Sequence, residues 1–97
     1  MAVETAQALT LVKSRLNRLQ TDSTLDEYLS ARIDAAKDEL EATGITLTDS
    51  TADLMLVVDY TVWAYSNRDK PASMPDWLRL RRRERWLQEG ANGFDPR

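Results

Sequence analysis

The sequence predicts a small all-α domain of four helices. Apolar residues in the first half of the chain recur every three or four positions, as they do on one face of a helix. N-capping side chains, glycine and proline separate the periodic segments. The length of 97 residues fits one domain. We therefore expect a helical domain over residues 1–90, with a long apolar third helix and a basic fourth helix, followed by a flexible tail over residues 91–97.

The first helix is predicted over residues 4–18. Its large apolar side chains recur at spacings of three and four, which predicts one buried stripe made of Leu9, Val12, Leu16 and Leu19. Lys13, Arg15 and Arg18 lie near its C-terminal end, where bases suit the helix dipole, and we expect them to be solvated.

The second helix is predicted over residues 25–42. One face carries its buried stripe, namely Leu25, Leu29, Ile33, Ala36 and Leu40. The other face is rich in acids, but these lack the fixed glycine and the spacing of a calcium loop, so we expect a solvated face. Gly44 is placed to end this helix in the left-handed conformation, with Ile45 as its hydrophobic contact. Leu47 is expected to reach the core.

The third helix is predicted to start near Asp49 or Ser50 and to end near Ser66. Ser50 and Asp53 resemble a weakened capping box. The interior is apolar on most sides, which is typical of a central helix. A strand is the alternative, because β-branched and aromatic residues are frequent here, but the caps and the lack of a pairing partner favour a helix. We expect Asp59 to be exposed on the one polar edge, the alternative being that it faces a groove or a neighbouring subunit.

The fourth helix is predicted to start at a Ser73 cap, with Pro75 in its first turn, and to end at Gly90. At 100° per residue its apolar side chains share one sector, so we expect that sector to pack on the domain: Trp77, Leu80 and Leu87. The opposite side carries Arg79, Arg82, Arg83 and Trp86.

Trp86 has two interpretations. Arg82 and Arg83, one turn earlier, could cover its ring by cation–π contact. Alternatively, Trp86 and its arginines form an interface anchor, since Trp and Arg dominate binding hot spots.

Composition narrows the possible chemistry. The chain has no Cys and no His, which excludes disulfides and thiolate metal sites and removes the commonest general base and metal ligand. The remaining carboxylates, lysines and hydroxyl groups form no recognisable catalytic array. We therefore expect a protein that is not an enzyme and that uses no cofactor and no metal.

Charge and hydropathy narrow the possible partners. The net charge is −3, with many acids over residues 22–59 and a strongly basic segment over residues 79–85. A general nucleic-acid binder is usually basic over its whole domain, so this charge distribution does not favour general nucleic-acid binding. No signal peptide is predicted, and the longest near-apolar run, residues 54–58, is far below the ~20 residues that span a bilayer. We expect a cytoplasmic protein that contacts no membrane.

The run VVDYTVWAYSNRD, the turn with Met74-Pro75 and the segment WLRLRRRERWL together resemble the small head–tail connector proteins of long-tailed phages. These proteins are also called head-completion or adaptor proteins. The likeness covers roughly residues 9–87, and it consists of four helices in the same order, an apolar third helix and an Arg-rich segment after Met-Pro.

The resemblance implies a structural virion protein without catalysis. Members of the family form a ring of roughly a dozen subunits beneath the portal protein. The ring continues the DNA channel, helps to retain DNA and presents a platform to the next tail or stopper protein. The expected partners are therefore the portal protein, further copies of the chain, the downstream protein, and DNA that passes without sequence-specific binding. The expected location is the head–tail neck of the virion, and the host cytoplasm during assembly.

The resemblance also suggests which residues make contacts. The last helix and the tail are expected to meet the portal through Arg79, Arg82, Arg83, Trp86 and Phe94. A second set is expected between subunits or along the channel, where like charge keeps DNA from sticking: Asp34, Lys37, Asp38, Glu41 and Asp59.

The main alternative is a small helical DNA-binding or regulatory protein that places Arg79–Arg85 on phosphates or in a groove. Its affinity would fall steeply with salt. The acidic balance stands against it, as does the connection over residues 67–72, which carries Pro71 and is longer than the turn of a helix-turn-helix. A helical adaptor outside any virus is a third possibility, and an enzyme is a distant fourth.

Overall fold

The computed structural model describes residues 3–69 and 73–93. This part of the chain forms four helices and no strand, as the sequence predicts: α1 (Thr5–Arg15), α2 (Asp26–Ala42), α3 (Thr51–Ser66) and α4 (Asp76–Gly93). The third apolar segment is a helix, so the alternative of a strand is wrong. Residues 94–97, which include most of the predicted tail and Phe94, lie outside the described residues.

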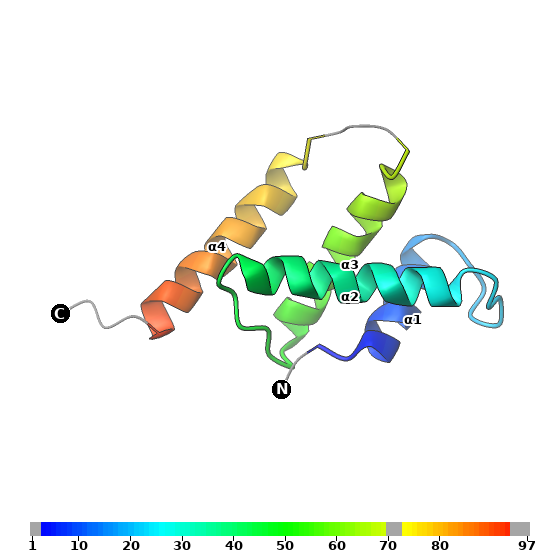
Figure 1. Ribbon diagram of the computed structural model, residues 1–97, viewed down its shortest axis with the longest axis horizontal. Helices are drawn as coiled ribbons and strands as arrows, with labels where there is room; N and C mark the ends of the chain where they lie inside the picture. The colour runs from blue at the N-terminus through cyan, green and yellow to red at the C-terminus, as the bar shows by residue number, and fades with distance from the viewer. Residues whose placement is uncertain (1–2, 70–72, 94–97) are drawn as a thin grey trace.

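Helices α1, α2 and α3 pack against one another in all three pairs, whereas α4 packs on α3 alone among the helices. Figure 1 shows α2 lying across α3, with α4 standing beside this three-helix unit. The molecule is accordingly long and thin, with principal extents of 52 × 30 × 18 Å. No helix in the described ranges is both long enough and apolar enough to pass through a lipid bilayer.

The hydrophobic core lies between the first three helices. The predicted stripe of α2 is confirmed at four positions, because Leu29, Ile33, Ala36 and Leu40 are buried and Leu25 is half-buried. Helix α3 is buried over more than half of its circumference, as expected of a central helix. Burying one such aliphatic side chain stabilises the fold by roughly 1.5–3 kcal/mol relative to leaving it in water.

The end of α1 differs from the prediction. The helix stops at Arg15 rather than Arg18, and Asn17 takes a left-handed conformation with φ of 59°. Asn tolerates this region because its short polar side chain can bond locally. The chain thereby leaves the helical path, so Leu19 is 74% exposed instead of buried.

Lys13 was expected to be solvated, yet its side chain is buried. Its ammonium group donates to the Asp26 carboxylate and to the carbonyl oxygen of Gln20, both at 2.9 Å. The loop between α1 and α2 supplies one acceptor and the first residue of α2 supplies the other, which compensates for the loss of water around the charge.

The connection between α2 and α3 follows the predicted capping. Gly44 has φ of 104°, its N–H donates to the carbonyl of Glu41, and Ile45 and Leu47 are buried. The Ser50 side chain accepts from the N–H of Asp53 at 3.2 Å, which caps α3. The Asp53 carboxylate bonds elsewhere, so only half of the capping box forms.

We expect Gly44→Ala to lower the free energy of unfolding by about 1–2 kcal/mol, because a side chain is strained at this φ. The new Cβ would also lie 3.3 Å from the indole Nε1 of Trp86. Urea unfolding at neutral pH measures the change. Gly90→Ala, in the interior of α4, is the matched control and should not destabilise. Equal effects at the two glycines would contradict the special role of the Gly44 conformation.

The bounds of α4 are shifted from the prediction. The carbonyl of Pro75 accepts from the N–H groups of Leu78 and Arg79 at 3.1 and 2.9 Å, so the helix begins at Asp76 and Ser73 is not its cap. At the other end the helix continues through Gly90 to Gly93. Residues 91–93, predicted as tail, are therefore helical.

The packing face of α4 was predicted wrongly. Leu78 is fully buried, whereas Trp77, Leu80 and Leu87 are 48%, 54% and 50% exposed. The helix is rotated so that Leu78 and two arginines, rather than the largest apolar side chains, face the domain.

Candidate functional site

Two buried carboxylates of α3 hold α4 in place, and Asp59 is the first. It is 6% exposed and accepts from Arg15 of α1 and from Arg81 of α4. The expected exposure of Asp59 on a polar edge is therefore wrong. Its charge is tolerated inside an apolar helix because two guanidinium groups compensate for it. Asp59 thus joins α1, α3 and α4 within one chain, and its buried carboxylate is not available to bind a neighbouring molecule.

Asp53 is the second buried carboxylate. Arg85 donates from Nε to Asp53 Oδ1 at 2.8 Å and from Nη2 to the carbonyl oxygen of Thr46 at 2.7 Å. Asp53 also accepts from the N–H of Thr48 at 2.8 Å. Burial acts to raise the pKa of Asp53, but the hydrogen bonds from Arg85 and Thr48 outweigh it and hold the pKa below its ordinary value. Arg85 is further held by Glu89, one turn later, at 3.1 Å.

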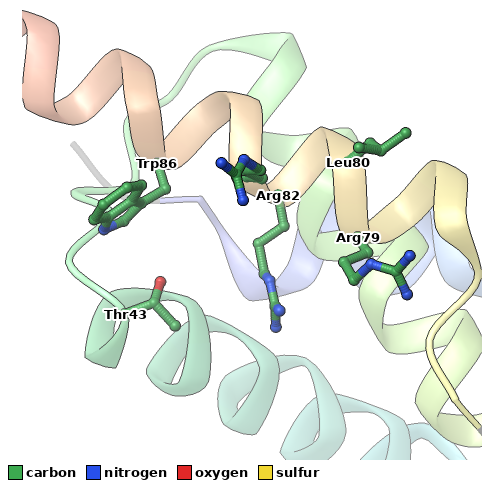
Figure 2. A pocket seen from close by; sticks show the side chains of 6 residues that line it. Thr43, Arg79, Leu80, Arg82 and Trp86 are labelled. Carbon is green, nitrogen blue, oxygen red and sulfur yellow. The ribbon is translucent and has the colours of Figure 1, made fainter.

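These contacts leave a groove between α4 and the C-terminal end of α2. Its volume is about 600 Å³, and it is lined by Thr43 of α2's cap and by five residues of α4: Arg79, Leu80, Arg82, Arg83 and Trp86. Figure 2 shows Trp86 and Arg82 pointing from α4 toward the end of α2, while Leu80 points away from it. The four described residues of the predicted partner interface therefore lie together around one groove.

The tryptophan of this groove is half-exposed. One edge of its ring lies against Gly44, and 49% of Trp86 remains accessible. Among the described residues, the arginines stacked on aromatic rings are Arg32 on Tyr28, Arg68 on Tyr65 and Arg81 on Trp77. No such contact joins Trp86 to Arg82 or Arg83 there. The interpretation in which these arginines cover the ring is therefore not supported.

A tyrosine and a glutamate lie beside the groove. The Tyr60 hydroxyl donates to Glu39 Oε1 at 2.5 Å. Burial and the neighbouring Glu39 raise the pKa of Tyr60 to about 12, against the opposing charge of Arg82. Tyr60 therefore stays protonated at neutral pH. Among the arginines of the groove, Arg79 and Arg83 are exposed and Arg82 is half-buried.

The second predicted set lies mostly on the outer face of α2. Asp34, Asp38 and Glu41 are exposed and Lys37 is half-buried. Asp34 accepts from the Thr5 hydroxyl at 2.6 Å, and Lys37 donates to the same hydroxyl oxygen at 3.3 Å. This set therefore forms one acidic surface, from which the buried Asp59 is separated.

Sequence reasoning missed the ion pairs that position the groove. Leu78, Arg81 and Arg85 recur at spacings of three and four, so the helical period alone could have identified them as a candidate packing face. Their partners, Asp53 and Asp59, come from α3, and no local pattern links the two segments.

No group of three or more His, Cys, Asp or Glu residues that could hold a metal ion occurs within residues 3–69 and 73–93. Comparison with protein-family models, with curated proteins and with solved structures finds no match to this chain.

Proposed function

We propose that the chain is a subunit of a phage head–tail connector ring, which lies under the portal, extends the DNA channel and joins head to tail. The resemblance of residues 9–87 to that family suggests the assignment. The observation that carries it is the placement of α4: it stands beside the three-helix unit and presents Arg79, Arg83 and Trp86 around a groove. A projecting helix with an exposed Trp–Arg surface suits a protein that acts by docking.

The groove is suited to a protein partner with an acidic and apolar surface. Half-exposed tryptophan and arginine side chains are the residue types that dominate binding hot spots. Arg81 and Arg85 fix α4 to α3 through buried carboxylates, so little order has to be gained when a partner binds. In the proposed function this partner is the portal protein.

The acidic face of α2 has a separate role in the proposal. It lies on a different surface from the groove and carries Asp34, Asp38 and Glu41. Such a surface either contacts a neighbouring subunit of the ring or, next to the DNA channel, repels the phosphates so that DNA passes without adhering. The downstream tail or stopper protein would meet the ring on its far side.

The alternative of a DNA-binding protein gains no support from the arginines of α4. Arg81 and Arg85 are engaged by buried carboxylates, and Arg79 pairs with Asp76 at 2.6 Å. They do not form one continuous surface that could follow a phosphate backbone. A DNA titration at two salt concentrations separates the classes, because phosphate binding weakens steeply with salt.

Co-sedimentation with DNA-filled, tail-less heads that carry the cognate portal tests the proposal. We expect saturable binding at one vertex and reduced leakage of DNA. Trp86→Gln should weaken binding by roughly 30-fold, the effect of losing a hot-spot residue. Leu19→Gln removes a still more exposed apolar side chain far from the groove and should bind normally. Absence of binding to heads that accept other completion proteins would refute the connector assignment.

A further inference from the structure

The outward side of α4 carries an apolar stripe that is about half exposed, and one of its members, Leu80, also lines the groove. Trp77, Leu80, Glu84 and Leu87 follow one another at spacings of three and four, on the side opposite the buried Leu78. We call these four residues the α4 stripe. Its three apolar members are about half exposed, and the Arg81 guanidinium lies 5.3 Å from the centre of the Trp77 ring. The stripe has the spacing of a helix that packs along another helix.

The outward side of α2 carries a second stripe with the same spacing. It lies opposite the buried leucines of α2 and is exposed at every position: Tyr28, Ala31, Ala35, Asp38 and Ala42. We call these five residues the α2 stripe. Its three alanines leave a shallow surface along which the backbone is accessible. Large side chains of a second helix can pack into such a surface, as ridges pack into grooves.

The charges beside the two stripes are complementary. Helix α2 holds six acids and two bases, while α4 holds five arginines and three acids. Within residues 3–69 and 73–93, neither Asp38 nor Glu41 forms an ion pair, and neither does Arg83. Opposite charges without partners in their own chain favour contact between two copies.

The positions of these charges also favour one relative orientation of α2 and α4 from two copies. Glu27, Asp34 and Glu41 lie along one edge of the α2 stripe, and Arg79 and Arg83 lie along the same-handed edge of the α4 stripe. Two helices packed face to face bring same-handed edges together only when they are antiparallel. Antiparallel packing therefore places the acids of α2 against Arg83, which forms no ion pair with the described residues, and against Arg79, whose described partner is the exposed Asp76.

We propose that the α4 stripe of one copy packs antiparallel on the α2 stripe of the next copy. The two stripes are different surfaces, so each chain can bind one neighbour on either side, which is a heterologous contact. Such contacts generate a ring when the rotation between neighbours closes. Closure of these contacts into a ring is the part of the inference that rests on the proposed function. Pairing of two α4 stripes is disfavoured, because antiparallel packing would bring Arg79 and Arg83 of the two copies together.

One helix pair is a small interface, of the size found in weak and transient complexes. Single contacts in solution should therefore be short-lived. In a closed ring on the portal, each chain binds two neighbours. This raises the effective concentration of the contacting surfaces.

The absence of native cysteine allows a direct cross-linking test. Ala35→Cys and Glu84→Cys place single thiols at the centres of the two stripes. Mixed in equal amounts and oxidised, these two variants should form the mixed dimer about tenfold faster than either homodimer, because the helix pair raises the local thiol concentration. A mixture of Ala35→Cys with Leu19→Cys provides the random-collision rate. Mixed dimers formed no faster than that rate would overturn the proposal.

Side-chain variants in the same cross-linking assay test the contacts themselves. Leu87→Gln in the Glu84→Cys chain should slow the mixed dimer about tenfold, whereas Leu19→Gln should not. Reversing Arg79 and Arg83 to Glu should slow it as well, and Asp34→Arg with Glu41→Arg in the other chain should restore the rate. Failure of this restoration would exclude the antiparallel arrangement.

The cross-linking outcome is independent of head binding. Rapid mixed dimers without binding to heads would retain the self-contact and remove the connector assignment. Saturable head binding together with cross-linking at the random-collision rate would retain the connector assignment and remove the self-contact.

Discussion

Leu78→Ala is expected to lower the free energy of unfolding by about 3 kcal/mol, the usual loss when a fully buried leucine is truncated. Leu78 is the one fully buried side chain among residues 76–89 of α4 and belongs to the hydrophobic core. Leu80→Ala, two residues later, removes the same atoms from a position that is 54% exposed and should cost less than about 1 kcal/mol.

Urea unfolding of both variants measures the difference, with an unchanged slope as the sign that the transition stays two-state. A larger loss at Leu80 than at Leu78 would mean that α4 packs by the sector that carries its largest apolar side chains. The groove and the α4 stripe would then be assigned to the wrong sides of the helix.

Asp53→Asn is expected to lower the free energy of unfolding by about 3 kcal/mol at neutral pH, because it leaves the Arg85 guanidinium without its buried carboxylate partner. The Arg85 side chain is only 14% exposed, so water compensates for little of this loss. Urea unfolding measures the change. Asp38→Asn removes an exposed carboxylate that bonds to no described residue and should be nearly neutral.

The effect of Asp53→Asn should depend on pH. The pKa of Asp53 is lowered in the folded state, so its carboxylate stabilises the fold above the ordinary pKa of 3.8. That stabilisation is lost as the pH falls through the lowered value. The difference between the parent chain and the variant should therefore be constant near neutrality and shrink below about pH 4. A difference that stays constant into strong acid would show that charge is not its cause.

The sequence by itself determined the elements whose causes are local. The period of apolar residues gives α2 its buried stripe, because neighbours three and four apart share a helix face. Ser50 and Gly44 mark helix ends because capping depends on side chains and φ angles within a few residues. The residues of α4 that the sequence suggests as a partner interface also line one groove, since a helix places Arg79, Arg82 and Arg83 close together whatever it packs against.

Only the tertiary structure decided which face of each helix packs against the rest of the domain. The helical period gives the angle between Leu78 and Leu80, but it does not tell which of them meets the core. Helix α4 has leucines on both sides, and the choice follows from carboxylates that α3 holds in reach of Arg81 and Arg85. The buried Asp59 has the same explanation. Its charge is acceptable inside the protein only because arginines from distant segments of the chain lie next to it. Packing brings these segments together, and no local sequence pattern indicates it.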